Sequence, residues 1–322
     1  MRDYRAFEKK LLTFATRKNA KIACVCFVFS FLYTGIIIVD QKIIQDTARA
    51  KIIPLPFVIS KPAEYPFISA VLGEKSMSFP ITAQAAIIMD NDSKVILYAK
   101  NENFRFSMAS TAKIMTALVA IEHFKSSDIL IVQNEKVEGV NVGFTKGEKV
   151  YFKDLLYAML LPSGNDAAIA IAQNYPGGEA VFVEKMNEKA KDLHLFKTHY
   201  TDASGLDDNG NYTTVLDLAR LASFGLKNET LSSIVATKKY VIRSLDGNVY
   251  ILNNLNKLLG IDGVYGMKTG HTEGAGDVLV TIKKEGEKAF ILVVMKSQDR
   301  FADTQTLLSL ISGQMQYQSM HP

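Results

Sequence analysis

Three short polar sequences contain the residue types that a serine nucleophile requires. In the first, Ser110 and Lys113 stand three residues apart at the start of an apolar run. On a helix, positions i and i+3 share a face, so the lysine amine could reach the serine hydroxyl. That hydroxyl is a weak nucleophile and needs a base within hydrogen-bond distance. A capped helix with a solvated lysine has the same spacing, so this pair alone does not establish a catalytic site.

The other two sequences supply complementary groups later in the chain. Ser163-Gly164-Asn165 lies between two apolar segments, and Lys268-Thr269-Gly270 follows a short run of strand character. The patterns S-x-x-K, S-x-N and K-T-G each occur once, in this order. Ligand sites commonly form in clefts. We therefore expect the three sequences to meet in a cleft between a sheet and a helical lobe.

The apolar patterns predict the elements that position these groups. Short β-branched runs around the turn Asn91-Asp92-Ser93 predict a hairpin. Helical spacing predicts helices from about 107 and at 153–161, 166–175, 180–195 and 213–226. Strands are expected again in a hairpin at 238–254 and at 263–271, 277–284 and 289–297, before a last helix at 300–315. The order predicts an α+β fold whose single antiparallel sheet is built from both ends of the domain, around an inserted, mostly helical lobe.

The N-terminal region predicts a membrane anchor. Residues 22–39 are uncharged and long enough to cross a bilayer as one helix. Residues 1–21 carry seven basic and two acidic residues, so the positive-inside rule places this tail in the cytoplasm. A cleaved signal peptide is the alternative, although its apolar core is normally only about 7–15 residues long. Because the basic charge is concentrated in the tail, it gives no support for nucleic-acid binding.

The rest of the chain divides into three further parts. Residues 40–80, which contain four prolines, are expected to form an extracytoplasmic linker, 81–316 a catalytic domain and 317–322 a short tail. Both cysteines, Cys24 and Cys26, fall inside the predicted span. No disulfide or zinc–thiolate site is therefore expected outside it. The histidines have no metal-ligand spacing, so no metal site is predicted.

Taken together, the three motifs resemble those of the penicilloyl serine transferases, which include β-lactamases and penicillin-binding proteins. More narrowly, the chain resembles the low-molecular-mass penicillin-binding proteins of the D-alanyl-D-alanine carboxypeptidase family. The resemblance covers about residues 80–315 and includes the stretches FRFSMASTAKIMTA, LLPSGNDAAIAIA and YGMKTGHTEGAG. It implies a β-lactamase/transpeptidase-like fold and a serine-type carboxypeptidase in the bacterial cell membrane. Such an enzyme removes the terminal D-alanine from peptidoglycan stem pentapeptides, is acylated by β-lactams and needs no metal or organic cofactor.

The resemblance also implies roles for individual residues. Lys113 would be the neutral general base, its pKa lowered by burial or by the neighbouring cation of Lys268. The remaining roles are these: Ser110 as nucleophile, Ser163 as proton shuttle, Asn165 as the group that holds Lys113 and the substrate amide, Lys268 and Thr269 as carboxylate ligands, Gly270 as space for a substrate lying along the strand, and the backbone N–H groups of Ser110 and His271 as the oxyanion hole. Arg300 is a further candidate for holding the substrate carboxylate.

Other activities use the same motifs. A D,D-endopeptidase that cuts peptidoglycan crosslinks is the main alternative, and a sensor that is acylated without turnover is another. A β-lactamase is disfavoured because no Glu-x-x-Leu-Asn of the class A type lies between the second and third motifs. Larger members of the family add a β-rich domain and a C-terminal membrane helix. Since this chain stops at Pro322, we expect the N-terminal span to serve as its anchor.

Overall fold

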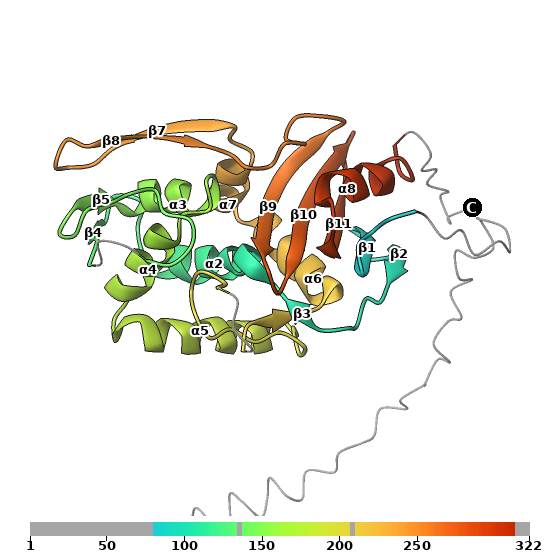
Figure 1. Cartoon of the computed structure of the whole chain (residues 1–322), viewed down its shortest axis with the longest axis horizontal. Coiled ribbons are helices and arrows are strands. Elements are labelled where there is room, and N and C mark those ends of the chain that lie inside the picture. Colours follow the sequence, from blue (N-terminus) through green and yellow to red (C-terminus); the bar gives the residue numbers. More distant parts are fainter. Residues whose placement is uncertain (1–79, 134–136, 207–209, 313–322) are drawn as a thin grey trace, which may run out of the picture. The chain divides into compact units, whose positions relative to one another are not determined.

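The computed structural model describes residues 80–133, 137–206 and 210–312 (Figure 1). The predicted cytoplasmic tail, the span at 22–39 and nearly all of the predicted linker lie outside these residues. So does the predicted tail at 317–322. Within the described ranges, no helix combines the length and the apolar character needed to cross a bilayer.

The main sheet has five antiparallel strands in the order β2-β1-β11-β10-β9. Their bounds are β1 Ala85–Asp90, β2 Ile96–Lys100, β9 Val264–Thr272, β10 Gly276–Glu285 and β11 Lys288–Ser297. The first strand pairs with the last, for example Ile88 with Leu292. The prediction of one sheet built from both ends of the domain is confirmed, and so is the hairpin of β1 and β2.

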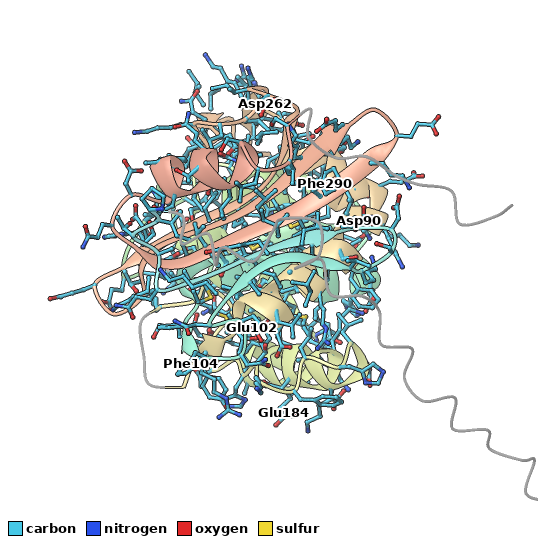
Figure 2. All side chains as sticks on the ribbon, turned by 90° about the vertical axis from the view of Figure 1, so that its right-hand side faces the viewer. Asp90, Glu102, Phe104, Glu184, Asp262 and Phe290 are labelled. Atoms are coloured by element: carbon cyan, nitrogen blue, oxygen red, sulfur yellow. The ribbon has the colours of Figure 1, made fainter. Side chains whose placement is uncertain are left out.

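Helices cover both faces of this sheet, so its central strands are continuously apolar rather than alternating. Ile87 and Val293 on one face belong to the core shared with the helical lobe. Ile88 and Leu292 on the other face pack with Leu307 of α8, Arg300–Leu308. This last helix ends at Leu308, whereas the sequence predicted an end at residue 315. Figure 2 shows α8 lying across the sheet strands.

The helical lobe matches most of the predicted segments. It contains the 3-10 turn η2 Ala109–Ala112 and the helices α2 Lys113–His123, α3 Phe152–Leu160, α4 Asn165–Asn174, α5 Gly178–Asp192, α6 Val215–Lys227 and α7 Glu229–Val235. Every residue of α2 from its first position to Ala120 is buried, as expected for a helix enclosed on all sides. Thr214 caps α6 by accepting the N–H of Asp217 at 3.1 Å.

Among the residues that the structure describes, three small two-stranded sheets lie outside the main sheet. The predicted hairpin forms as β7 Lys239–Arg243 and β8 Val249–Asn253, but it makes a sheet of its own. Its inner face covers the helical lobe, where the Tyr240 ring stacks on Tyr157 at 3.7 Å between centroids. The other two sheets, β3 Phe106–Ser107 with β6 Tyr212–Thr213 and β4 Ile129–Ile131 with β5 Lys149–Tyr151, were not predicted. Strands of two or three residues are too short to show a period.

Candidate active site

The amine of Lys113 is the most enclosed group of the candidate site. Ser110 lies in η2, and Lys113 is the first residue of α2, with no exposed surface. Its Nζ lies 2.8 Å from Ser110 Oγ, 2.7 Å from Asn165 Oδ1 and 2.7 Å from the carbonyl oxygen of Ser204. A neutral amine can donate two hydrogen bonds and accept one. Asn165 Oδ1 and the Ser204 carbonyl oxygen can accept the two hydrogen atoms of the amine. The lone pair of the nitrogen can then face the Ser110 hydroxyl.

Burial favours this neutral form. It lowers the pKa of Lys113 from 10.5 to about 7, and the carboxylates of Asp202 and Asp166 only partly oppose the shift. Burial also lowers the pKa of Lys268 well below its usual value, with further lowering from the charges of Lys113 and Arg300. The sequence had suggested either burial or the charge of Lys268 as the cause for Lys113. The structure points to burial.

The loop before α4 brings Ser163 to the amine of Lys268 and Asn165 to the amine of Lys113. Ser163 has φ +70°, a left-handed conformation that non-glycine residues seldom adopt and that is often found at functional sites. Its Oγ accepts a hydrogen bond of 3.0 Å from Lys268 Nζ. Asn165 accepts from Lys113 through Oδ1 and donates to the carbonyl of Glu138 through Nδ2, at 2.7 Å each. The orientation of the Asn165 amide is thus set by one donor and one acceptor.

The third motif lies on β9, the end strand of the sheet. Lys268 and Thr269 are buried. A Cβ added to Gly270 would lie 3.1 Å from Ala109 Cβ and 3.3 Å from the Ser110 nitrogen. We expected Gly270 to leave room for a substrate along the strand. The structure gives another reason: without a side chain, β9 can approach the turn that carries the nucleophile.

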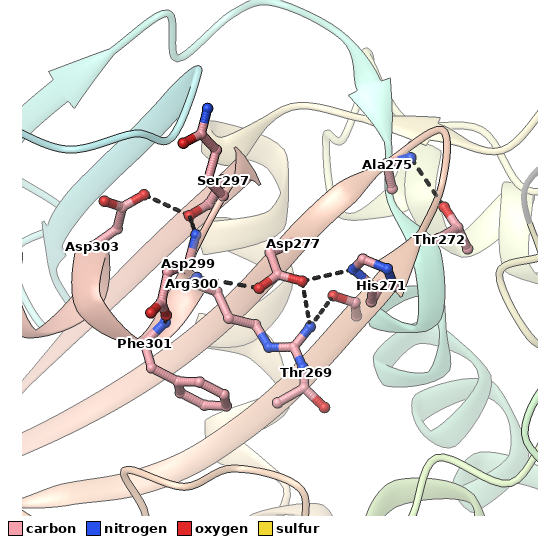
Figure 3. A network of polar contacts seen from close by, with 12 residues as sticks. Thr269, His271, Thr272, Ala275, Asp277, Ser297, Asp299, Arg300, Phe301 and Asp303 are labelled. Carbon is pink, nitrogen blue, oxygen red and sulfur yellow. Dashed lines mark hydrogen bonds and ion pairs between the residues drawn. The ribbon is translucent and has the colours of Figure 1, made fainter.

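Two further predicted residues, His271 and Arg300, lie just beyond this motif (Figure 3). The His271 side chain is 65% exposed, and its Nδ1 lies 2.7 Å from Asp277 Oδ1. Arg300, the first residue of α8, donates from Nη1 to the carbonyl oxygen of Gly270 at 2.8 Å and to Asp277 at 3.1 Å. The guanidinium thus contacts the backbone of the K-T-G strand. Its role toward a substrate carboxylate stays a prediction.

Sequence reasoning missed the loop at 202–205. Asp202 Oδ1 accepts the N–H groups of Ser204 at 2.6 Å and Gly205 at 2.7 Å. Gly205 has φ +78°, and a Cβ there would lie 2.0 Å from the carbonyl oxygen of Ala109. The loop therefore presses against the nucleophile turn and directs the Ser204 carbonyl to Lys113. Because that contact comes from the backbone, residue types gave no signal for it.

The side chains of the candidate site carry hydroxyl, amine and amide groups. In the ranges that the structure covers, no three His, Cys, Asp or Glu side chains form a group that could hold a metal ion. Hydrogen bonds join Ser110, Lys113 and Asn165 in one part of the site's polar cluster, and Ser163 and Lys268 in the other. Burial lowers the pKa of Lys268, and the two parts are close enough for the charge of Lys113 to lower it further. This arrangement suits acyl transfer to a serine.

The fold and this cluster define a serine acyl-transfer protein of the penicillin-binding class. The chain belongs to the D-alanyl-D-alanine carboxypeptidase family, peptidase family S11, whose profile matches residues 73–299. It is similar to the crystal structure of the Streptomyces K15 DD-transpeptidase, with 31% identity and a TM-score of 0.68 over 71% of this chain and 96% of that one.

Curated relatives bear different names within the family. D-alanyl-D-alanine carboxypeptidase DacF of Bacillus subtilis (strain 168) is 32% identical over 230 residues, which are 69% of this chain and 59% of that protein. A D-alanyl-D-alanine endopeptidase of Pseudomonas aeruginosa is 30% identical over 237 residues, with 70% and 76% covered. The chain therefore spans less than two thirds of the length of DacF.

Proposed function

We propose that the protein is a serine-type D-alanyl-D-alanine carboxypeptidase that removes the terminal D-alanine from peptidoglycan stem pentapeptides. One observation carries the proposal: the fully buried Lys113 amine lies 2.8 Å from Ser110 Oγ, and its pKa is lowered to about 7. A base whose pKa lies near the working pH is well suited to proton transfer. Membership of the family supports the choice of substrate.

In this mechanism, acylation begins when Lys113 takes the hydroxyl proton of Ser110. Oγ attacks the carbonyl carbon of the D-Ala-D-Ala bond, and the backbone N–H groups of Ser110 and His271 stabilise the oxyanion. Such a donor is worth roughly 3–4 kcal/mol to the barrier. The C–N bond then breaks as the Ser163 hydroxyl gives its proton to the leaving amine and receives in its place the proton that Lys113 took from Ser110. Water subsequently hydrolyses the Ser110 ester and releases the shortened peptide.

The strand side would hold the substrate. Lys268 and Thr269 bind its terminal carboxylate, and the peptide lies along β9 as an added strand. Two observations support this assignment: β9 is the end strand of the sheet, and Lys268 Nζ bonds to Ser163, so a carboxylate bound there would lie beside the proposed shuttle. β-Lactams would acylate the same Ser110.

We also propose that the protein works outside the cytoplasmic membrane of a bacterium. The uncharged run at 22–39 would span the bilayer once, with the basic tail inside and the catalytic domain outside. The peptidoglycan substrate lies on that side.

The test uses the full chain in detergent micelles and a pentapeptide that ends in D-Ala-D-Ala. The wild type should release free D-alanine over many turnovers, and Ser110→Ala should release none. Ser233→Ala, a change in the exposed part of α7, is the matched control and should behave as wild type. No release by wild type, or equal release by Ser110→Ala, would sink the proposal. A single stoichiometric release would indicate the sensor instead.

A second substrate separates the endopeptidase alternative, which the similarity to the Pseudomonas aeruginosa endopeptidase favours. A crosslinked muropeptide dimer, offered at the same concentration, should be cut much more slowly than the pentapeptide. Faster cleavage of the dimer would reassign the enzyme as an endopeptidase.

A further inference from the structure

The Asp277 carboxylate joins two residues beside the proposed oxyanion hole. Asp277 lies on β10 directly across from His271 on β9. One oxygen, Oδ1, lies 2.7 Å from His271 Nδ1 and 3.1 Å from Arg300 Nη1. The other oxygen, Oδ2, accepts the backbone N–H of Arg300 at 3.3 Å. Figure 3 shows the carboxylate between the two side chains.

Arg300 in turn holds one particular peptide unit. Its Nη1 donates to the carbonyl oxygen of Gly270 at 2.8 Å. That carbonyl and the N–H of His271 belong to the same planar peptide, in which the two groups point in opposite directions when it is trans. The Gly270–His271 bond is not among the cis bonds of the described residues. A cation on the carbonyl therefore fixes the direction of the N–H, and it also polarises the N–H into a stronger donor.

Asp277 is the main polar support of that guanidinium. Among the described residues, it is the one carboxylate that forms an ion pair with Arg300. The Nε of Arg300 is buried and has no hydrogen-bond partner there. The side chains of Asp277 and Arg300 are only 21% and 17% exposed, so solvent screens their attraction less than that of an exposed pair. Without the carboxylate, the guanidinium would keep little beyond the Gly270 carbonyl and its packing near the Phe301 ring.

We propose that Asp277 is a positioning residue for acylation: it holds Arg300 on the Gly270 carbonyl and so aims the His271 N–H at the developing oxyanion. This inference rests on the proposed function. It separates two roles, because Lys268 and Thr269 bind the substrate carboxylate, whereas Asp277 and Arg300 set the geometry of one oxyanion donor.

The test measures acylation of the full chain in detergent by a fluorescent penicillin. Asp277→Ala should lower the acylation rate constant by about 10- to 50-fold, less than complete loss of an oxyanion donor. Asp277→Asn, which keeps the size of the side chain, should lower it by about 10-fold. The final stoichiometry should stay at one penicilloyl group per chain. With the pentapeptide, kcat should fall while KM changes by less than about 3-fold, as expected for an interaction made mainly in the transition state.

Further variants define the route of the effect. If Asp277 acts through Arg300, the double variant Asp277→Ala/Arg300→Ala should be within about 2-fold of Arg300→Ala alone, because residues in one network do not add. Asp262→Asn is the matched control. It removes a carboxylate that forms an ion pair of 3.0 Å with Lys283, which lies on β10 as Asp277 does, and it should leave the rate unchanged.

Each outcome is decisive. Acylation of Asp277→Ala at the wild-type rate, or additive losses in the double variant, would overturn the inference. A reduced stoichiometry of Asp277→Asn with an unchanged rate in the labelled fraction would show a purely structural role and would also overturn it. If the wild type itself is not labelled, the proposed function fails first. A labelled wild type with an unaffected Asp277→Ala variant rejects only the role of Asp277.

Discussion

The two halves of the site are held in place in different ways. In the nucleophile half, the fully buried Lys113 amine contacts Ser110, Asn165 and Ser204, which come from three separate segments. In the strand half, the end of β9 is tied to α8 by Asp277 and Arg300, whose side chains keep some solvent exposure. One half is enclosed, and the other lies at an end strand.

This difference follows from what each half is proposed to do. A lysine can serve as a base at neutral pH only where burial disfavours its charged form. A substrate can add to a strand only where the strand edge is free. The Lys113 amine has no exposed surface, whereas the side chains of Asp277 and Arg300 keep 21% and 17% exposure. Solvent therefore screens the Asp277–Arg300 contacts of the strand half more than those of Lys113. We therefore expect larger effects from substitutions in the nucleophile half.

The largest effect is expected from Lys113→Met. Removal of the base should lower the rate of acylation by fluorescent penicillin by about 10³-fold or more. The free energy of unfolding should change by no more than about 3 kcal/mol, because two effects oppose each other. The variant no longer buries a polar amine, which stabilises it, but two buried acceptors lose their hydrogen bonds, which destabilises it. Lys146→Met, at an exposed position, is the control and should acylate normally. A Lys113→Met protein that keeps a tenth of the wild-type rate would remove Lys113 from the mechanism.

Lys268→Met tests the strand half. Because the proposed ligand of the substrate carboxylate is lost, kcat/KM for the pentapeptide should fall by about 10²-fold, with much of the loss in KM. This contrasts with Lys113→Met, whose loss should lie in the chemical step. Steady-state kinetics with saturating peptide distinguish the two. If Lys268→Met leaves KM unchanged and lowers only kcat, then Lys268 belongs functionally with the nucleophile half.

The sequence predicted the two halves unequally. Ser110, Lys113, Asn165 and Lys268 were all named from their motifs. The structure joins the first three by hydrogen bonds and brings Lys268 near enough for the charge of Lys113 to lower its pKa further than burial alone does. The order of strands and helices was also predictable, because buried strands and helices have distinct apolar periods. Short elements such as β3 and β4 were not, since two or three residues carry no period.

The sequence did not predict the contacts that hold the site residues in place through the backbone or through distant side chains. Ser204 contributes its carbonyl to Lys113 across 91 residues, and no pattern of side chains marks that contact. Asp277 was not named either, although it lies seven residues beyond the K-T-G motif. Its partner on α8 is brought near only when β10 and β11 pair. Long-range pairing of this kind depends on the register of the sheet.

Gly270→Ala joins the two halves in one measurement. The added methyl group would lie 3.1 Å from Ala109 Cβ and 3.3 Å from the Met108 carbonyl oxygen, so β9 and η2 must separate slightly. We expect about a 10-fold lower acylation rate, because small displacements of reacting groups are costly. The melting temperature should fall by several degrees, as overpacking costs about 1–3 kcal/mol. Thr272→Ala, near the end of the same strand, is the control. Wild-type kinetics in Gly270→Ala would show that the approach of β9 to η2 is not needed.

The pH dependence of acylation locates the base in the nucleophile half. Since the pKa of Lys113 is lowered to about 7, the acylation rate should fall as the pH drops through about 7, by roughly 10-fold between pH 8 and pH 6. Stability should change in a related way. Between about pH 7 and 10.5, the unfolded chain binds a proton at Lys113 that the folded protein lacks, so this residue makes the free energy of unfolding rise with pH. The rise should be smaller in Lys113→Met, and thermal unfolding from pH 6.5 to 9 measures the difference. If both proteins show the same slope, the lysine is charged in the folded state, and the proton of Ser110 must be taken by another group.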